Sequence, residues 1–237
     1  EIVLKNIESV PMFDGAKTIS YDDGVADGRI NYIPQSVIDS YLDEVSKQGI
    51  HTDLVKSSGL KVVYTPLNGT GNKPVRAILK KIGVEDVTVV PEQEYPDGNF
   101  PTCPFPNPEI KEALAKGLEL CNVVKPDLLL ATDPDCDRVG IAVPSDNGYE
   151  LFTGNEVGAM LLEYICSERT KMGTMPADPV AVKTIVTTDI AAKIAKEYGV
   201  KLIEVLTGFK FIGEQIGFLE DKGQEDRYIF GFEESYG

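Results

Sequence analysis

Three aspartates at alternate positions, closed by an arginine, form the stretch of this sequence with the clearest chemistry. The segment reads Asp133-Pro134-Asp135-Cys136-Asp137-Arg138. Carboxylates this close together repel one another unless a cation neutralises them. Oxygen ligands suit a hard ion such as Mg²⁺, Mn²⁺ or Ca²⁺ better than zinc. The pattern therefore predicts a divalent cation site with Asp133, Asp135 and Asp137 as ligands.

The spacing of the residues excludes an EF-hand calcium site, and Arg138 favours a site that also binds phosphate. An EF-hand loop starting at Asp133 needs Gly at its sixth position and Glu at its twelfth. Those positions hold Arg138 and Pro144. An arginine beside a metal is explained if a phosphate shares the site, because the guanidinium grips phosphate oxygens in a fork. A solvated acidic turn remains the alternative.

The other reactive residue types indicate little further chemistry. His51 is the only histidine of the sequence and lies far from any motif, so a Ser-His-Asp or Cys-His catalytic set is not expected. The four cysteines are widely spaced and contain no CxxC pair, which is typical of a reduced cytosol. In an extended loop, Cys136 would point away from its aspartate neighbours.

Composition narrows the class of protein. The chain has 237 residues, 42% of them hydrophobic, and a formal net charge of −15. Nucleic acids and anionic membranes select for basic surfaces, so neither is expected as a partner. No apolar run has the length of a membrane span, and no signal-peptide pattern opens the chain. A cytoplasmic enzyme of small anionic metabolites fits these observations.

Hydrophobic runs and turn residues predict the elements that position these side chains. The predicted strands and helices give an α/β fold of two similar β-α-β-α-β units, with mixed sheets flanked by helices. In the first unit we expect strands at 60–65 and 87–90, a helix at 74–83 and a helix opened by Asn107-Pro108. In the second we expect helices at 156–168 and 189–198 and strands at 180–186, 202–206 and 228–230. The motif-bearing loops follow strand ends, where such sheets bind ligands.

The same pattern divides the chain into three parts. Residues 1–35 contain successive Asp-Gly turns and are expected to be an irregular connector from an upstream domain. Residues 36–150 form a domain that carries the acidic loop, and residues 151–237 form a second α/β domain. The chain stops directly after an active-looking loop, so we expect it to be a piece of a longer protein.

Four motifs in order resemble the α-D-phosphohexomutases, the family of phosphoglucomutase and phosphomannomutase. The acidic segment resembles their metal-binding loop, and Gly231-Phe232-Glu233-Glu234-Ser235-Tyr236-Gly237 resembles their sugar-recognition loop. Thr65-Pro66-Leu67-Asn68-Gly69-Thr70-Gly71 is similar to the start of their second domain, and Thr207-Gly208-Phe209-Lys210 to a loop of their third. The similarity covers residues 60–237 and is greatest to the phosphoglucomutase/phosphopentomutase branch.

The resemblance implies a Mg²⁺-dependent mutase that interconverts sugar 1-phosphate and 6-phosphate, most simply of glucose, through a phosphoserine and a bisphosphorylated intermediate. By position, Asp133, Asp135 and Asp137 would hold Mg²⁺, and Arg138 and Lys210 would act in catalysis. Glu233, Ser235, Lys210 and Lys183 would bind the phosphorylated sugar. Lys183 lies in a predicted strand, and its alternative is a side chain that points to solvent.

Two motifs of the resembled family do not occur in this sequence. These are the phosphoserine loop (Thr-Ala-Ser-His-Asn-Pro) and the C-terminal phosphate-gripping loop (Arg-x-Ser-Gly-Thr-Glu-Pro). We therefore expect the second and most of the third domain of such an enzyme, which needs its remaining domains as partners and is inactive alone. The preferred sugar and the oligomeric state stay open.

Two other functions also remain open. A haloacid-dehalogenase-like phosphatase would place Asp-x-Asp after an apolar strand and use Asp133 as the nucleophile. A non-catalytic cation-binding module would bind Mg²⁺ or Ca²⁺ without responding to sugar phosphates.

Overall fold

The computed structural model describes residues 2–11 and 13–235, and the chain divides into two compact units, residues 1–41 and 42–237. The first unit contains α1 (Ile2–Glu8), α2 (Tyr21–Ala26) and the start of α3 (Gln35–Ser46). The expectation that residues 1–35 are irregular is therefore wrong. Ser20 explains α2, because its Oγ accepts the backbone N–H of Asp23 at 3.1 Å and caps a helix start that the sequence presents as a turn.

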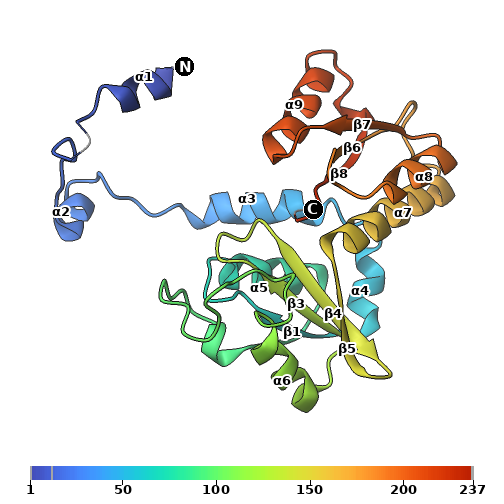
Figure 1. Cartoon of the computed structure of the whole chain (residues 1–237), viewed down its shortest axis with the longest axis horizontal. Coiled ribbons are helices and arrows are strands. Elements are labelled where there is room, and N and C mark those ends of the chain that lie inside the picture. The colour runs from blue at the N-terminus through green and yellow to red at the C-terminus, as the bar shows by residue number, and fades with distance from the viewer. Residues whose placement is uncertain (1, 12, 236–237) are drawn as a thin grey trace. The chain divides into compact units, whose positions relative to one another are not determined.

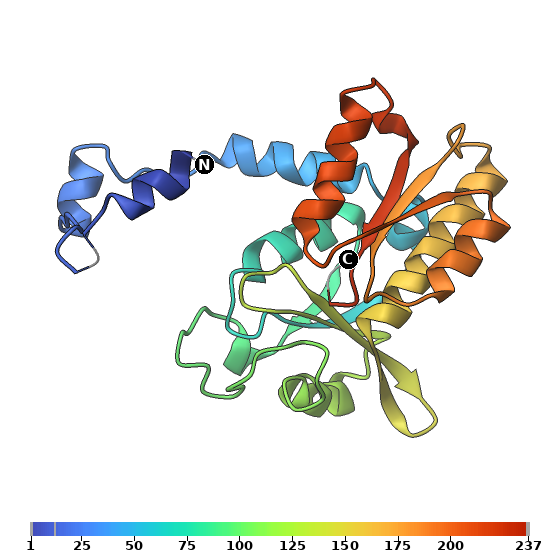
Figure 2. The same ribbon diagram turned by 45° about the horizontal axis from the view of Figure 1, so that its top comes forward.

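The larger unit contains a five-stranded mixed sheet in the order β2-β1-β3-β4-β5 (Figures 1 and 2). β1 (Lys61–Thr65) pairs in parallel with β2 (Asp86–Val89) and with β3 (Leu128–Thr132). β4 (Val139–Ser145) and β5 (Gly148–Phe152) continue the sheet in antiparallel pairing. Because β1 and β3 are parallel, the loops that leave them lie at the same edge of the sheet.

Helices cover both faces of this sheet. Successive strand residues point to opposite faces, so each strand contributes side chains to both helix layers. Val63 and Leu129 pack with Cys121 of α6 (Ala115–Val124), whereas Val62 and Tyr64 pack with Leu79 of α5 (Asn72–Ile82). A further helix that the sequence did not indicate, α4 (Thr52–Ser58), precedes β1, and a short 3-10 helix (Pro91–Gln93) follows β2.

The helix expected at Asn107-Pro108 begins seven residues after Pro108, at Ala115. The Asn107 side chain accepts the backbone N–H of Glu109 at 3.0 Å, which closes a local turn. Asparagine caps helices and turns through the same type of bond, and the sequence alone does not distinguish the two.

The second sheet has three parallel strands in the order β7-β6-β8. Its elements are α7 (Gly154–Met172), β6 (Val180–Thr184), α8 (Ile190–Glu197), β7 (Lys201–Val205), α9 (Phe209–Glu220), a 3-10 helix (Glu225–Arg227) and β8 (Tyr228–Phe232). α7 and α8 pack on one face of the sheet and α9 on the other (Figures 1 and 2). All five residues of the central strand β6 are buried.

This architecture confirms the predicted α/β class with two helix-flanked sheets, although the second sheet is parallel in the described residues and not mixed. The predicted domain boundaries stay a prediction. Within the described part of the chain, no helix is long and apolar enough to cross a membrane.

Candidate functional site

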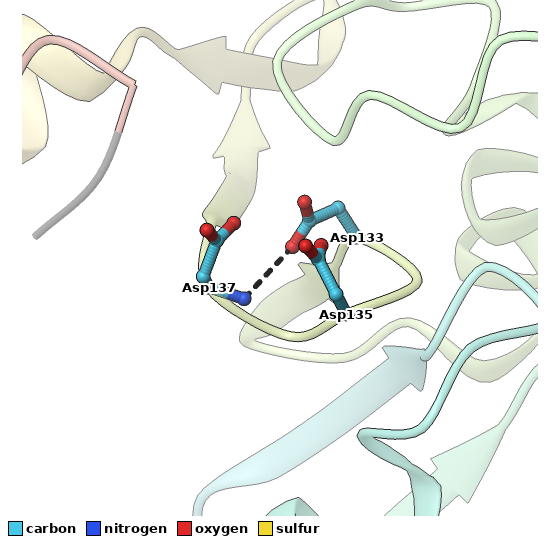
Figure 3. Close-up of side chains that lie close together, drawn as sticks. All are labelled: Asp133, Asp135 and Asp137. Carbon is cyan, nitrogen blue, oxygen red and sulfur yellow. Dashed lines mark hydrogen bonds between the residues drawn. The ribbon is translucent and has the colours of Figure 1, made fainter. Parts of the chain in front are cut away.

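The acidic loop, residues 133–138, leaves the carboxyl end of β3. Asp133 is buried, whereas Asp135 and Asp137 are exposed. One carboxylate oxygen from each of the three lies within 4.8 Å of the others (Figure 3). The structure therefore brings together the three side chains that the sequence singled out as metal ligands.

Backbone hydrogen bonds to Asp133 shape the loop. Its Oδ1 accepts the N–H of Asp137 at 3.1 Å and that of Arg138 at 2.9 Å, and its carbonyl accepts the N–H of Cys136 at 3.0 Å. Cys136 has a φ of 63°, a left-handed conformation that few non-glycine residues adopt. The loop is thus a tight turn, and the expectation of an extended loop at Cys136 is wrong.

The electrostatics of the loop favour a cation. Burial raises the pKa of Asp133 to about 6, and Asp135 and Asp137 add to this shift, whereas the Arg138 backbone N–H opposes it. The Arg138 Nε lies 3.7 Å from Asp133 Oδ2 and 4.0 Å from Asp137 Oδ1. One guanidinium against three carboxylates leaves negative charge in excess. A hard divalent ion fits this oxygen donor set.

A glycine-bearing loop, residues 66–71, supports the acidic loop. The backbone N–H and the hydroxyl of Thr70 donate to the Pro134 carbonyl at 2.8 and 3.0 Å. A Cβ on Gly69 would lie 2.3 Å from the Pro134 Cα, so only glycine permits this approach. The sequence motif indicated the start of a domain at this loop but, apart from its glycines, gave no sign of its contact with Pro134.

The 233–235 loop follows β8, at the edge of the second sheet. The Glu233 side chain is buried, and its Oε1 accepts the N–H of Gly208 in the Thr207–Lys210 segment. Its Oε2 is also buried and has no hydrogen-bond partner among the described residues. Ser235 is half-buried, and Tyr236 and Gly237 of the same motif lie outside the described residues.

The start of α7 places this loop. A Cβ on Gly154 would lie 1.8 Å from the Glu234 carbonyl oxygen, and the Gly154 N–H donates to Glu109 Oε1 at 3.1 Å. The Thr153 hydroxyl accepts the N–H of Glu156 and the Glu156 carboxylate accepts the N–H of Thr153, a capping box that fixes the first turn. The loop therefore rests on a well-defined helix end.

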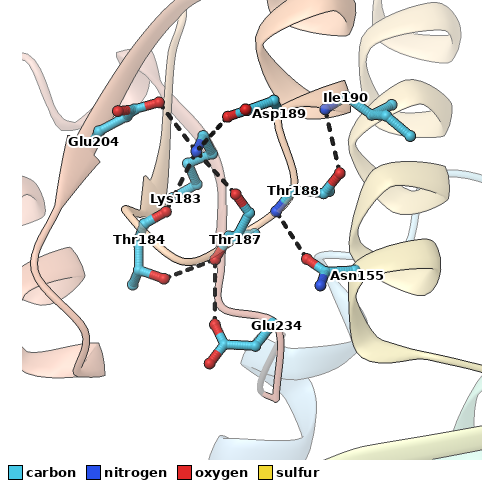
Figure 4. Close-up of polar contacts among 9 residues, drawn as sticks. All are labelled: Asn155, Lys183, Thr184, Thr187, Thr188, Asp189, Ile190, Glu204 and Glu234. Atoms are coloured by element: carbon cyan, nitrogen blue, oxygen red, sulfur yellow. Dashed lines mark hydrogen bonds and ion pairs between the residues drawn. The ribbon is translucent and has the colours of Figure 1, made fainter.

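The two predicted lysines differ in their surroundings. Lys210 is exposed, and its Nζ lies 4.6 Å from the centre of the Phe211 ring. Lys183 is only 1% exposed. Its Nζ lies 3.0 Å from the Thr187 carbonyl oxygen and 3.0 Å from Glu204 Oε1 (Figure 4). The alternative that Lys183 points to solvent is therefore wrong.

Comparison with known proteins identifies two consecutive domains of one family. The description "phosphoglucomutase/phosphomannomutase, alpha/beta/alpha domain II" matches residues 39–147, and domain III of the same family matches residues 153–237. A phosphoglucomutase from Staphylococcus aureus strain N315 is 36% identical over 209 residues, and one from Staphylococcus saprophyticus is 35% identical over 214 residues. These alignments cover 88% and 90% of this chain but only 36% and 38% of the relatives.

Solved structures share the fold at lower identity. A candidate phosphomannomutase from Thermus thermophilus aligns with a TM-score of 0.64 and 24% identity, over 85% of this chain and 41% of its own. A phosphoglucomutase/phosphomannomutase family protein from Burkholderia thailandensis gives 0.60 and 17%, over 90% and 42%. The two domain matches together account for most of the sequence, and the chain belongs to the phosphoglucomutase/phosphomannomutase family.

Proposed function

We propose that this chain supplies the metal-binding and sugar-binding parts of a mutase that interconverts sugar 1-phosphate and sugar 6-phosphate. The supporting observation is the convergence of three carboxylates after β3 in a member of a family whose named relatives are phosphoglucomutases. Glucose phosphate is the substrate to test first. Residues 36–150 and 151–237 would act as the second and third domains of the enzyme, with 1–35 as the connector from an upstream domain.

In this proposal Asp133, Asp135 and Asp137 hold Mg²⁺, and Arg138 contacts the phosphate. A bound Mg²⁺ would neutralise the negative charge that develops on a transferred phosphoryl group. Asp133 has a second role besides metal binding, because its Oδ1 accepts two backbone N–H groups. It fixes the loop while Asp135 and Asp137 present exposed oxygens.

Glu233, Ser235 and Lys210 form the proposed sugar-binding group. The unpartnered Glu233 Oε2 is a buried acceptor, and a buried acceptor without a partner costs free energy that a sugar hydroxyl would recover. The Ser235 hydroxyl can donate or accept, which suits a substrate that binds in two orientations. Lys210 would contact the phosphate. The phosphoserine and the remaining domains of the enzyme lie outside residues 1–237 in this proposal.

A Mg²⁺ titration by calorimetry tests the metal site. We expect the Asp135→Asn and Asp137→Asn variants to bind Mg²⁺ at least about tenfold more weakly than the unmodified chain. Asp146→Asn is the matched control, because Asp146 is an exposed aspartate in the β4–β5 turn and should leave the affinity unchanged. Equal affinity in all four proteins, each with an unchanged circular dichroism spectrum, would favour the alternative that the acidic loop is a solvated turn without a metal site.

A second titration, with glucose 1,6-bisphosphate, separates the mutase from a simple cation-binding module. We expect binding that Glu233→Gln weakens, because the amide keeps an acceptor for Gly208 but replaces the acceptor at Oε2 by a donor. Glu225→Gln, on the exposed 3-10 helix before β8, is the matched control. Mg²⁺ binding without any response to the bisphosphate would favour the cation-binding module.

The phosphatase alternative has less support. Its nucleophile would be Asp133, whose side chain is buried and whose Oδ1 is engaged by two N–H groups. The two domain matches also belong to a mutase family. Mass spectrometry that finds an aspartyl-phosphate on Asp133 after incubation with a sugar phosphate would reverse this preference.

A further inference from the structure

The buried ammonium group of Lys183 has a structural setting that a role in packing does not explain. Lys183 lies on β6 on the same face as Ala181, next to the apolar core under α7 and α8, and is 1% exposed. Removing an ammonium group from water is costly unless hydrogen bonds and opposite charges replace the water. A leucine or methionine would fill the same space without that cost.

The ion pairs of Lys183 are too solvated to offset the cost of burying its ammonium group. Its Nζ lies 3.0 Å from Glu204 Oε1 and 3.6 Å from Asp189 Oδ1, but these side chains are 51% and 95% exposed. Exposed partners of this kind contribute little to stability, because water screens the charges. The contacts that water does not screen are those to two backbone carbonyl oxygens, Thr187 at 3.0 Å and Thr184 at 3.4 Å.

The Thr184 carbonyl group lies at the end of β6, and the Thr187 carbonyl group lies in the loop that follows, residues 185–189. The hydroxyls of Thr184 and Thr187, both buried, lie 2.7 Å apart. The Thr187 hydroxyl donates onward to Glu234 Oε2 at 3.5 Å (Figure 4). On the other side of the loop, the Thr188 N–H donates to Asn155 Oδ1 at 2.8 Å. Lys183 and the start of α7 thus hold the loop from two sides.

The contact to Glu234 extends this network to the 233–235 loop. The neighbouring residue Glu233 accepts the Gly208 N–H, so the loops that follow β6, β7 and β8 form one connected set. Because the three strands are parallel, these loops share the carboxyl edge of the sheet. A displacement of Thr187 would therefore be transmitted to Glu234, Glu233 and Gly208.

We propose that Lys183 is a positioning residue, which fixes the Thr184 and Thr187 carbonyl groups and through the Thr187 hydroxyl sets the geometry of the 233–235 loop. In this proposal Lys183 does not contact the substrate directly, as the sequence led us to expect, but acts on it through the 233–235 loop. The consequence for sugar binding rests on the function proposed above. The effect on the loop itself does not, and it is measurable without sugar or metal.

Amide hydrogen exchange followed by NMR, without ligand, tests the proposal. We expect Lys183→Met to speed exchange of the Gly208 amide by about fivefold to tenfold, the effect of weakening one hydrogen bond. The amides of Asp137 and Arg138, in the loop between β3 and β4, should keep their rates. Lys201→Met is the matched control, since Lys201 is an exposed lysine on β7, and it should have no effect.

Substitutions at Thr187 provide a second, milder set of variants. Thr187→Val removes the hydroxyl at nearly constant volume, and we expect it to accelerate Gly208 exchange, whereas Thr187→Ser keeps the hydroxyl and should restore the original rate. The Lys183→Met/Thr187→Val double variant should be no faster than the faster single variant, because both act along one path. An unchanged Gly208 rate in folded Lys183→Met would overturn the proposal. If that variant does not fold, an unchanged rate in Thr187→Val would do so.

A titration with glucose 1-phosphate connects the result to substrate. If the unmodified chain binds the sugar phosphate, Lys183→Met should weaken binding and Lys201→Met should not, and equal affinities would overturn the link to sugar. Failure of the unmodified chain to bind counts against the proposed function alone. The exchange rates would still decide whether Lys183 positions the loop.

Discussion

Asp133 combines two demands that conflict in the absence of a cation. It is buried, and its Oδ1 closes the acidic loop by accepting two backbone N–H groups. These bonds favour the ionised form, but burial and the two neighbouring carboxylates raise its pKa to about 6. At neutral pH the metal-free loop therefore carries a carboxylate in an unfavourable environment, and this cost is what a bound cation would offset.

The raised pKa predicts a specific dependence of stability on pH. Unfolded aspartate loses its proton near pH 4, whereas folded Asp133 keeps its proton up to about pH 6. The folded state binds more protons in this window, so the free energy of unfolding should fall as pH rises from about 4 to 6. Solvent around Asp135 and Asp137 screens part of the effect, which we expect to be on the order of 2 kcal/mol.

Urea unfolding without divalent ions at pH 4.5 and pH 7 measures this dependence. Other carboxyl groups titrate too, so the informative quantity is the difference between the unmodified chain and Asp133→Asn. The variant keeps the acceptor at Oδ1 and should gain stability relative to the unmodified chain as pH rises. Parallel pH curves for the two proteins would contradict the assigned pKa.

At the scale of elements, loops that end neighbouring strands support one another. The glycine loop 66–71 follows β1, and its Thr70 holds the Pro134 carbonyl of the acidic loop that follows β3. In the second sheet, Gly154 at the start of α7 lies against the Glu234 carbonyl. In both places a glycine lets one backbone approach another, so the site geometry depends on main-chain contacts as much as on the ligand side chains.

Gly69→Ala should disturb the metal site without touching a ligand. Its Cβ would lie 2.3 Å from the Pro134 Cα and 2.5 Å from the Pro134 oxygen, so the two backbones must separate. We expect a loss of about 1–3 kcal/mol of stability and weaker Mg²⁺ binding by calorimetry. Gly213→Ala in α9 is the matched control, because an added Cβ there meets nothing within 4 Å. Unchanged Mg²⁺ affinity in Gly69→Ala would show that the glycine loop does not set the ligand positions.

The elements that the sequence predicted well are those with a strong local pattern. Apolar runs located the strands that carry the site, and the spacing of the aspartates located the carboxylate cluster. Failures occurred where distant contacts decide: Gly69 and Pro134 are far apart in the chain, and Lys183 meets Glu204 only because β6 and β7 align. The start of α6 failed for a local reason, since Asn107 caps a turn as readily as a helix.

At the scale of the whole molecule, this chain corresponds to about a third of the length of its relatives. The first Staphylococcus aureus alignment covers 36% of that phosphoglucomutase. Within residues 42–237, contacts join the regions of the two sheets: His51 Nε2, just before α4, lies 2.8 Å from Glu168 Oε2 of α7. The proposed metal and sugar groups follow different sheets, and this contact is one of those that join the two regions.

We predict that residues 1–237 bind Mg²⁺ but show no mutase turnover, because the sequence contains no Ser-His-Asn-Pro loop to donate the phosphoryl group. A coupled assay for glucose 6-phosphate formed from glucose 1-phosphate measures this directly. Asp137→Asn gives the background of contaminating enzyme. Product formation above that background would mean that this chain contains a phosphoryl donor. The proposal that the phosphoserine lies outside residues 1–237 would then be wrong.

The left-handed turn places a cysteine thiol in the acidic loop, and the reactivity of that thiol reports on the loop. The Cys136 Sγ lies against Gly71, 2.9 Å from where a Cβ of that glycine would be, and burial raises the pKa of the thiol, with the nearby aspartates adding to the shift. Alkylating reagents attack the thiolate, which this setting makes scarce. Cys136 is half-buried, so its alkylation should be slow because the thiolate is scarce. The rate is therefore set by the entire turn and its aspartates and not by the cysteine alone.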